Sequence, residues 1–278
     1  MKSRFAVLAD RPAPIRIAAF LGVLLGAWLP LAAPIYLLGQ DDNQVTIATM
    51  GLLFVEFLVW LGLWGRWVYG SRAGFRRYGL GWSRQNGVEY LLGLGLGAVS
   101  LAMLLGLEGW LGWLRWQEPS LPWLRLVIEG LISASAIATA EELVFRGWLL
   151  EELSWDYQPN TALWANSVAF GVLHFLKPLN EILRTWPAFP GLVLLGLTLV
   201  WARRSRQGRL GLSIGLHAGL VWGYYVADVG KLLTYTQQVP VWVTGIDRNP
   251  LAGLMGLMFL GAIAAVLQRQ SAKSTAAK

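Results

Sequence analysis

The chain has no cysteine, only two histidines and few charged residues. The lack of cysteine excludes disulfides, zinc held by thiolates and a thiol nucleophile. Only 14% of its 278 residues are charged, against roughly 25% in soluble globular domains. The sequence also has no internal repeat, and no low-complexity segment besides its Lys/Ala/Ser-rich end. This composition argues against an ordinary soluble domain.

Apolar residues dominate instead. The chain is 55% hydrophobic with a mean hydropathy of +0.49 and contains 16 tryptophans, a residue that favours membrane–water interfaces. Eight apolar stretches approach the roughly 20 residues that cross a bilayer, the fifth and sixth being short. They cover residues 15–38, 47–69, 88–114, 121–150, 161–176, 188–201, 210–227 and 251–267. The sequence predicts an all-α polytopic membrane protein, with about eight transmembrane helices in one integral membrane domain over residues 1–278.

Basic residues predict how the chain is oriented. The net charge is +7, but the basic residues occupy short segments between apolar stretches, which is the pattern of cytoplasmic loops and not of a nucleic-acid-binding face. The basic residues form four groups, and with eight spans all four groups fall on the cytoplasmic side of the membrane. Both termini are then cytoplasmic, with tails at 1–14 and 268–278. Asp41, Asp42 and the segment 239–250 fall on the opposite side. The groups comprise Lys2, Arg4, Arg11 and Arg16; Arg66, Arg72, Arg76, Arg77 and Arg84; Arg203, Arg204, Arg206 and Arg209; and Arg269, Lys273 and Lys278.

Glycines along the seventh stretch predict a close helix contact. Gly211, Gly215, Gly219 and Gly223 recur every four residues, so a neighbouring helix can approach their face closely. His217 is two residues out of phase with this series and therefore points away from the contact.

The fourth stretch contains the string Glu-Glu-Leu-Val-Phe-Arg at 141–146. Glu142 and Arg146 are four residues apart on one helix face, in the favoured acid-before-base order, and are expected to form a structural ion pair. Glu141 lies about 100° around the helix and is left without a partner. An unpaired carboxylate in an apolar environment can act as a general acid or base.

The two histidines lie in two further stretches. His174 follows Phe170 by one turn, and His217 lies in the seventh stretch. A single membrane histidine is commonly a buried group bonded to a carbonyl, but ionisable residues in three separate spans favour a shared functional site.

Two chemistries remain open for such a site. Glu141, His174 and His217 match a catalytic zinc ligand set in number, but the HExxH spacing is absent. In a metal-free site, Glu141 and one histidine would activate water while the second histidine stabilises the oxyanion.

The ordered motifs carry a family resemblance. Glu-Glu-x-x-x-Arg at 141–146, Phe-x-x-x-His at 170–174 and a later membrane histidine at 217 resemble the three motifs of the CPBP family. This family of CAAX proteases and bacteriocin-processing enzymes, also called the Abi family, includes the type II CAAX prenyl endopeptidases. The resemblance covers about residues 134–225 and implies a helical membrane protease whose site lies among the fourth, fifth and seventh helices.

The resemblance also implies a role for each motif residue. Glu141 with His174 would activate water, and His217 would help hold the oxyanion. Three residues would support them: Glu142, Arg146 and Phe170. The implied mechanism needs no cofactor. If zinc were bound, its ligands would be Glu141, His174 and His217, but the resemblance does not favour zinc. The implied partners are membrane lipids and a hydrophobic or lipid-anchored peptide substrate, including prenylated CAAX proteins.

The sequence departs from the family at one position. The third motif usually reads His-x-x-x-Asn, but Val221 stands in place of the asparagine. The missing amide would be a second oxyanion donor, and loss of one such donor costs about 10²–10³ in rate. This departure favours an alternative function, a non-catalytic membrane scaffold or immunity-type protein of the same fold. The retained Glu141, His174 and His217 favour an endopeptidase.

The predicted orientation can be tested directly, because the chain has no native cysteine. Arg76→Cys should react with a membrane-impermeant maleimide only after the membrane is made permeable, since the arginine-rich loops are cytoplasmic. Labelling of this cysteine in intact cells would contradict the topology.

Overall fold

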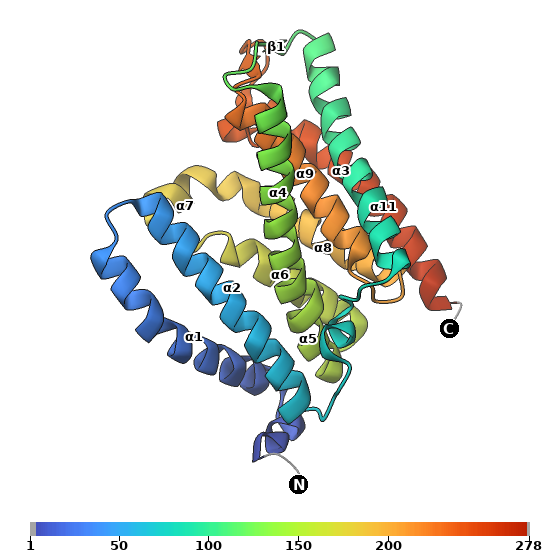
Figure 1. Ribbon diagram of the computed structural model, residues 1–278. Helices are drawn as coiled ribbons and strands as arrows, with labels where there is room; N and C mark the ends of the chain where they lie inside the picture. Colours follow the sequence, from blue (N-terminus) through green and yellow to red (C-terminus); the bar gives the residue numbers. More distant parts are fainter. Residues whose placement is uncertain (1–3, 277–278) are drawn as a thin grey trace.

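The computed structural model describes residues 4–276, and its elements are almost all helical (Figure 1). The long helices are α1 (Ala13–Leu38), α2 (Asp42–Trp67), α3 (Arg84–Trp110), α4 (Trp123–Glu142), α6 (Pro159–Leu173), α8 (Phe189–Ser205), α9 (Gly211–Val229) and α11 (Leu254–Ala276). The shorter helical segments are η1 (Arg4–Asp10), η2 (Gly74–Tyr78), η3 (Leu143–Leu149), α5 (Leu150–Asp156), α7 (Leu179–Thr185), η4 (Trp186–Ala188), α10 (Val241–Thr244), η5 (Ile246–Arg248) and η6 (Pro250–Ala252). Strands β1 (Leu114–Trp116) and β2 (Leu233–Tyr235) form an antiparallel ribbon in which Leu114 lies opposite Tyr235.

The predicted all-α polytopic membrane fold is confirmed. Within residues 4–276, six helices are long and apolar enough to cross a membrane. The candidate spans are Ala13–Leu38, Asp42–Trp67, Arg84–Trp110, Trp123–Asp156, Leu179–Ser205 and Leu254–Ser274. The fifth and seventh predicted stretches form α6 and α9, which are not among these six, so the number of eight crossings stays a prediction. The division into one membrane domain with two tails also stays a prediction.

One predicted boundary was wrong. The sixth stretch was expected to be short, but α7 and η4 lead directly into α8 and lengthen this segment. Hydropathy missed α7 because Glu181 and Arg184 interrupt its apolar residues. At the other end of the chain, α11 extends into the segment 268–278, whose assignment as a cytoplasmic tail stays a prediction. Lys2, Lys278 and the outermost residues of both predicted tails lie outside the described residues.

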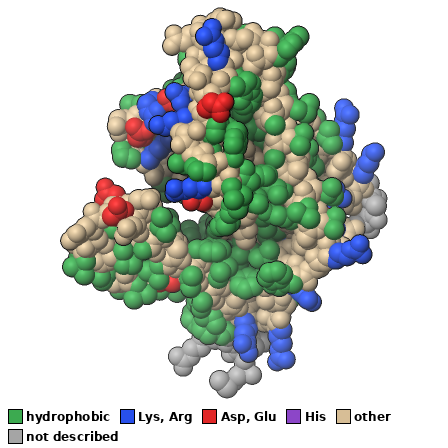
Figure 2. Space-filling model, turned by 45° about the horizontal axis from the view of Figure 1, so that its top comes forward, with side chains coloured by type: hydrophobic (Ala, Val, Ile, Leu, Met, Phe, Trp, Pro, Cys, Tyr) green, Lys and Arg blue, Asp and Glu red, His purple; other side chains and the backbone are tan. Residues whose placement is uncertain are grey.

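The described basic segments gather at one end of the molecule. The segment after α2 and the loop after α8 line one cleft, to which they contribute Arg77 and Arg209 respectively. The start of α1 adjoins the end of α5 through Arg16 and Asp156, and the last turns of α11 line a second hollow beside Arg203. Figure 2 shows Lys and Arg side chains along the lower and right-hand edge of the molecule. This common placement agrees with the charge pattern, while the assignment of this end to the cytoplasm stays a prediction.

Helices α3 and α9 pack at backbone distance, as the glycine series predicts. A methyl group at Gly215 would lie 2.0 Å from the carbonyl oxygen of Tyr90, and one at Gly219 would lie 2.3 Å from that of Leu94. The contact is reciprocal, because a methyl group at Gly93 would lie 2.4 Å from the carbonyl oxygen of Leu212. Such distances admit only glycine. This contact fixes the position of α9 and turns His217 toward α4.

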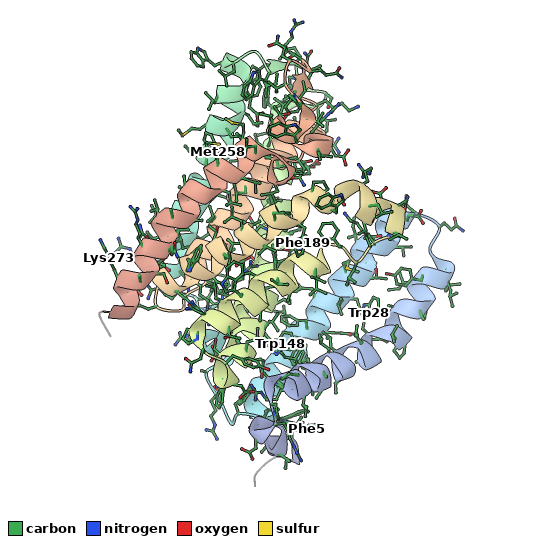
Figure 3. All side chains as sticks on the ribbon, turned by 180° about the vertical axis from the view of Figure 1, so that it is seen from behind. Phe5, Trp28, Trp148, Phe189, Met258 and Lys273 are labelled. Atoms are coloured by element: carbon green, nitrogen blue, oxygen red, sulfur yellow. The ribbon has the colours of Figure 1, made fainter. Side chains whose placement is uncertain are left out.

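The α1–α2 hairpin joins the remainder of the fold through a buried polar network. Glu152 of α5 accepts hydrogen bonds from Arg16 Nε (2.8 Å), from Trp64 Nε1 (2.9 Å) and from the Tyr69 hydroxyl. Beside this network, the Trp148 ring stacks on Phe20 of α1 at a centroid distance of 4.2 Å, and Figure 3 labels Trp148 where the hairpin meets the bundle. The network anchors the hairpin to α5, the direct continuation of the α4 segment.

Candidate active site

The glutamate pair lies where the fourth predicted helix changes its winding. Glu141 and Glu142 are the last residues of α4, and the next seven residues form a π-helix, η3 (Leu143–Leu149). The π-helix is rare and is found frequently at functional sites. The sequence predicted one continuous α-helix here, and no residue in the string marks the change of winding.

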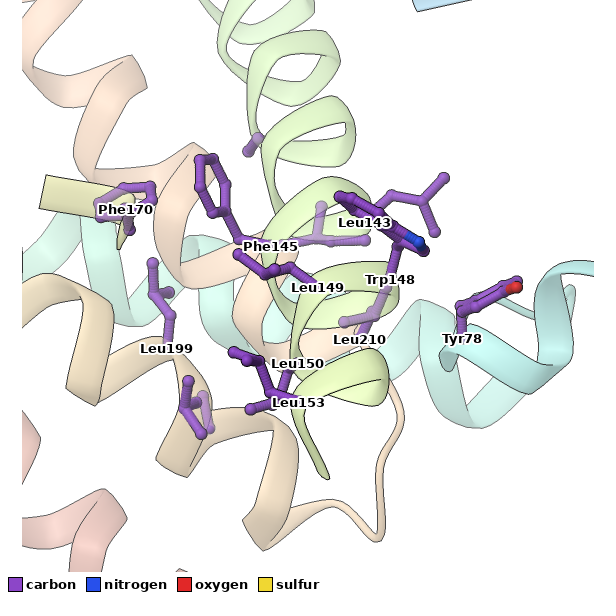
Figure 4. Packing of buried hydrophobic residues seen from close by; sticks show 14 of the residues in the cluster. Tyr78, Leu143, Phe145, Trp148, Leu149, Leu150, Leu153, Phe170, Leu199 and Leu210 are labelled. Atoms are coloured by element: carbon purple, nitrogen blue, oxygen red, sulfur yellow. The ribbon is translucent and has the colours of Figure 1, made fainter. Parts of the chain in front are cut away.

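Packing around η3 holds this segment in place. Asn166 of α6 is completely buried, and its Nδ2 donates a hydrogen bond of 2.7 Å to the carbonyl of Phe145. The ring of Phe145 meets Phe170 edge-on at a centroid distance of 5.0 Å, and Figure 4 shows both rings on the same side of the segment. Asn166 therefore holds η3, a role that its place in the sequence did not reveal.

Glu142 is completely buried and accepts two hydrogen bonds at one oxygen. Its Oε1 lies 3.0 Å from Arg146 Nη1 and 3.0 Å from His217 Nδ1. Arg146 is equally buried, donates to the carbonyl of Gly196 at 3.3 Å, and lies over the ring of Phe170 at 4.2 Å. The predicted Glu142–Arg146 ion pair is present. The contact with His217 was missed, because spacing along one helix does not reveal partners on another.

His217 presents its second nitrogen to Glu141. Arg146 donates to Glu142 Oε1, and His217 Nδ1 is assigned as the second donor to the same oxygen. The other ring nitrogen, Nε2, lies 3.8 Å from Glu141 Oε2. The arrangement is that of a histidine oriented by a buried carboxylate, which is common among catalytic histidines.

His174 approaches the same carboxylate oxygen. It directly follows the last residue of α6, and its Nδ1 lies 2.8 Å from the carbonyl of Phe170. A carbonyl can only accept, so this nitrogen donates and Nε2 is left with a lone pair. His174 Nε2 lies 3.7 Å from Glu141 Oε2. The structure thus brings Glu141, His174 and His217 together at one point.

The three groups are slightly too far apart for direct hydrogen bonds. Direct N–H···O hydrogen bonds span about 2.7–3.2 Å, whereas Glu141 Oε2 lies 3.7 and 3.8 Å from the two histidine nitrogens. This oxygen is shielded from solvent and has no hydrogen-bond partner among the described residues. As whole side chains, Glu141 and His174 are about one-third exposed, at 30% and 33%, whereas Glu142 and Arg146 are fully enclosed. The outer parts of Glu141 and His174 are therefore accessible, while the ion pair beneath them is not.

A cavity of about 250 Å³ adjoins the two histidines. Its walls are mainly apolar and include Val221, the position where the family motif has asparagine, and Asn249 of the segment between η5 and η6. Glu141 does not line this cavity. The sequence offered no reason to select Asn249, because it lies outside all three motifs. The cavity can hold an apolar group next to the histidines.

Metal ligation requires three or more side chains that converge on one point. Among residues 4–276, no group of three His, Cys, Asp or Glu side chains has an arrangement able to hold a metal ion. In this arrangement, Glu141, His174 and His217 therefore do not fit the zinc alternative.

Comparison with known proteins confirms the predicted family resemblance. The family model described as type II CAAX prenyl endopeptidase Rce1-like matches residues 122–223. The match begins just before α4 and ends within α9, so it includes Glu141, His174 and His217. No curated protein and no solved structure matched the chain. The Rce1-like match covers less than half of the chain and supports a CAAX-type membrane protease.

The buried ion pair generates a stability prediction. Arg146→Ala leaves Glu142 buried without its cation, so the free energy of unfolding should fall by about 3–5 kcal/mol. A matched control is Arg125→Ala, because Arg125 forms an exposed i,i+4 pair with Glu129 on the same helix and should change stability by only about 0.3–0.5 kcal/mol. Both can be compared by thermal unfolding in detergent. Equal effects would show that Arg146 does not stabilise the fold through Glu142.

Proposed function

We propose that this protein is an intramembrane endopeptidase that hydrolyses a peptide bond in a hydrophobic or lipid-anchored substrate, the class to which prenylated CAAX proteins belong. One observation carries the proposal, the convergence of His174 Nε2 and His217 Nε2 on Glu141 Oε2 at 3.7 and 3.8 Å. The Rce1-like match over residues 122–223 supports a protease of this type. The groups required for water activation are thus close together and placed among apolar helices.

In the proposed reaction, a water molecule lies between Glu141 and His174. The unprotonated Nε2 of His174 orients the water, and Glu141 removes its proton as the water oxygen bonds to the scissile carbonyl carbon. When the tetrahedral intermediate collapses, the carbon–nitrogen bond breaks and Glu141 returns the proton to the leaving amine. The products are a carboxylic acid and an amine.

His217 stabilises the negative charge that develops on the carbonyl oxygen. Its Nδ1 is held by Glu142, and the proposed step uses the ring with a hydrogen on Nε2 as well. Nε2–H then donates to the oxyanion. Arg146 and Phe170 act indirectly, since Arg146 holds Glu142 and the Phe170 carbonyl fixes the tautomer of His174.

Val221 supports a second candidate function, a non-catalytic scaffold or immunity-type protein of the same fold. The valine lines the cavity beside His217 and offers no hydrogen bond to an oxyanion. A scaffold would need the fold and the buried ion pair but not the ionisable Glu141. The two functions therefore predict different results when Glu141→Gln is expressed in a cell that lacks the parent gene. A scaffold would still restore the parent phenotype, whereas a protease would not.

Cleavage of a membrane-anchored reporter peptide by purified protein tests the enzyme proposal. Glu141→Gln and His174→Ala should each lower the rate by about 10²–10⁴ while leaving the melting temperature unchanged, because they remove the base and the group that positions water. Glu129→Gln is the control, since it removes a carboxylate from the exposed side of the same helix.

Two outcomes would contradict this proposal. If Glu141→Gln restores the phenotype of a deletion strain as well as the parent protein does, the scaffold function is correct. If a chelator abolishes the parent's activity and added zinc restores it, the metal-free mechanism is wrong.

The departure at position 221 gives a separate prediction. Val221→Asn should leave cleavage equal or raise it, by up to about 10²–10³, because it supplies an amide donor toward the oxyanion. Val221→Leu is the control, as it changes the size of the side chain without adding a donor. If both variants slow cleavage alike, the side chain at 221 only fills space and another group holds the oxyanion.

A further inference from the structure

A basic cleft of about 430 Å³ opens at the arginine-rich end of the molecule. Four arginines and one glutamate are the charged residues that line it: Arg76, Arg77, Arg203, Arg209 and Glu151. They come from η2, from the last turn of α8, from the turn between α8 and α9, and from α5. Positive charge is therefore in excess within the cleft.

Two of these arginines are held by protein groups. Arg209 Nη2 lies 2.6 Å from an oxygen of Glu89 on α3. Arg203 donates to the carbonyl of Gly208 at 3.0 Å and lies 3.6 Å from Glu151. Both guanidinium groups are thereby fixed at the wall of the cleft.

The other two arginines have capacity left for a ligand. Arg77 lies over the ring of Tyr69 at 4.3 Å, and its Nη2 is 4.0 Å from Glu151. Its Nε and Nη2 are shielded from solvent and have no hydrogen-bond partner among residues 4–276. Arg76 is exposed and forms no ion pair within the described chain. The exposed guanidinium of Arg76 is suited to bind an anion such as a phosphate, and the charge of Arg77 beside it adds to the attraction.

An apolar pocket of about 490 Å³ lies directly beside the basic cleft. Phe75, Leu80, Tyr90 and Ile214 contribute to its walls. The two hollows share a rim, formed by Arg76, Gly81, Trp82, Ser83 and Asn86. The ring of Trp82 is fully exposed at this rim, and tryptophan is typical of the headgroup level of a membrane.

We propose that the two hollows together bind one anionic glycerophospholipid, with its phosphate in the basic cleft and an acyl chain in the apolar pocket. The positive charge selects an anionic headgroup, because basic pockets between membrane helices attract such lipids. The adjoining apolar walls select a molecule that carries a long chain on its phosphate. The lipid would bridge η2, α3 and α9, and this binding does not depend on the proposed protease activity.

Native mass spectrometry of the purified protein, titrated with phosphatidylglycerol or with phosphatidylcholine of the same chain length, tests the proposal. The parent should bind phosphatidylglycerol preferentially. Arg76→Gln should weaken this binding about fivefold, and the double variant R76Q/R77Q about 25-fold. Arg269→Gln is the control, because it removes one exposed charge from α11 at the same end.

A second pair of variants tests the apolar pocket. Gly87 lines the pocket, and a Cβ added there meets no atom within 4 Å, so Gly87→Leu should fold normally and occupy the space of the acyl chain. It should weaken binding of long-chain phosphatidylglycerol but not of glycerol phosphate. Gly95→Leu, at an exposed and equally open position of the same helix, should have no effect.

Three results would overturn the proposal. The first is equal binding of phosphatidylglycerol by the parent and by R76Q/R77Q when both have the same melting temperature. The second is an equal loss of binding in the Arg269 control. The third is slower peptide cleavage by Arg76→Gln with unchanged lipid binding, which would assign the cleft to the substrate instead.

Discussion

One buried carboxylate oxygen, Oε1 of Glu142, connects the three parts of the candidate site. It accepts from Arg146 of η3 and from His217 of α9 at 3.0 Å each. A buried carboxylate without its cation is strongly unfavourable, so the positions of α4, η3 and α9 relative to one another are coupled through this atom. Glu141 is adjacent to Glu142 in the chain, and its own position follows from this arrangement.

The coupling works because the backbone of α9 is held firmly on its other face. Glycines of α9 and α3 bring the two helices to distances at which no side chain fits. A helix held this closely can neither rotate nor slide without steric conflict. His217, on the opposite side of α9 from the glycines, therefore meets Glu142 at a fixed depth. Structural glycines on one face thus position an ionisable group on the other.

Much of this arrangement could be predicted from the sequence, because it depends on local patterns. Hydropathy located the helices, the glycine spacing identified the close face of α9, and the i,i+4 spacing identified the Glu142–Arg146 pair. The three motifs also gave the family that the Rce1-like match supports. Each of these features depends on residues that are near one another in the chain.

The remaining features depend on contacts between segments that are distant in the sequence. Spacing along α4 could not show that His217 shares the carboxylate of Glu142, and nothing in the string after Glu142 marks a π-helix. Asn166 and Phe145 lie in different helical segments, so the hydrogen bond from the Asn166 amide to the Phe145 carbonyl of η3 could not be read from the sequence. Asn249 lies in a loop without a motif and reaches the cavity only through the folding of the last third of the chain.

The π-helix at Leu143–Leu149 also has a consequence for how such a site can evolve. A π-turn contains one more residue than an α-turn, and one residue corresponds to a rotation of about 100°. The helix before η3 can therefore direct its glutamates toward the histidines while α5 directs Leu150 and Leu153 into the core. The change of winding lets the half before η3 be oriented for the reaction and the half after it be oriented for packing. Each half of a long membrane helix can then change its sequence independently of the other.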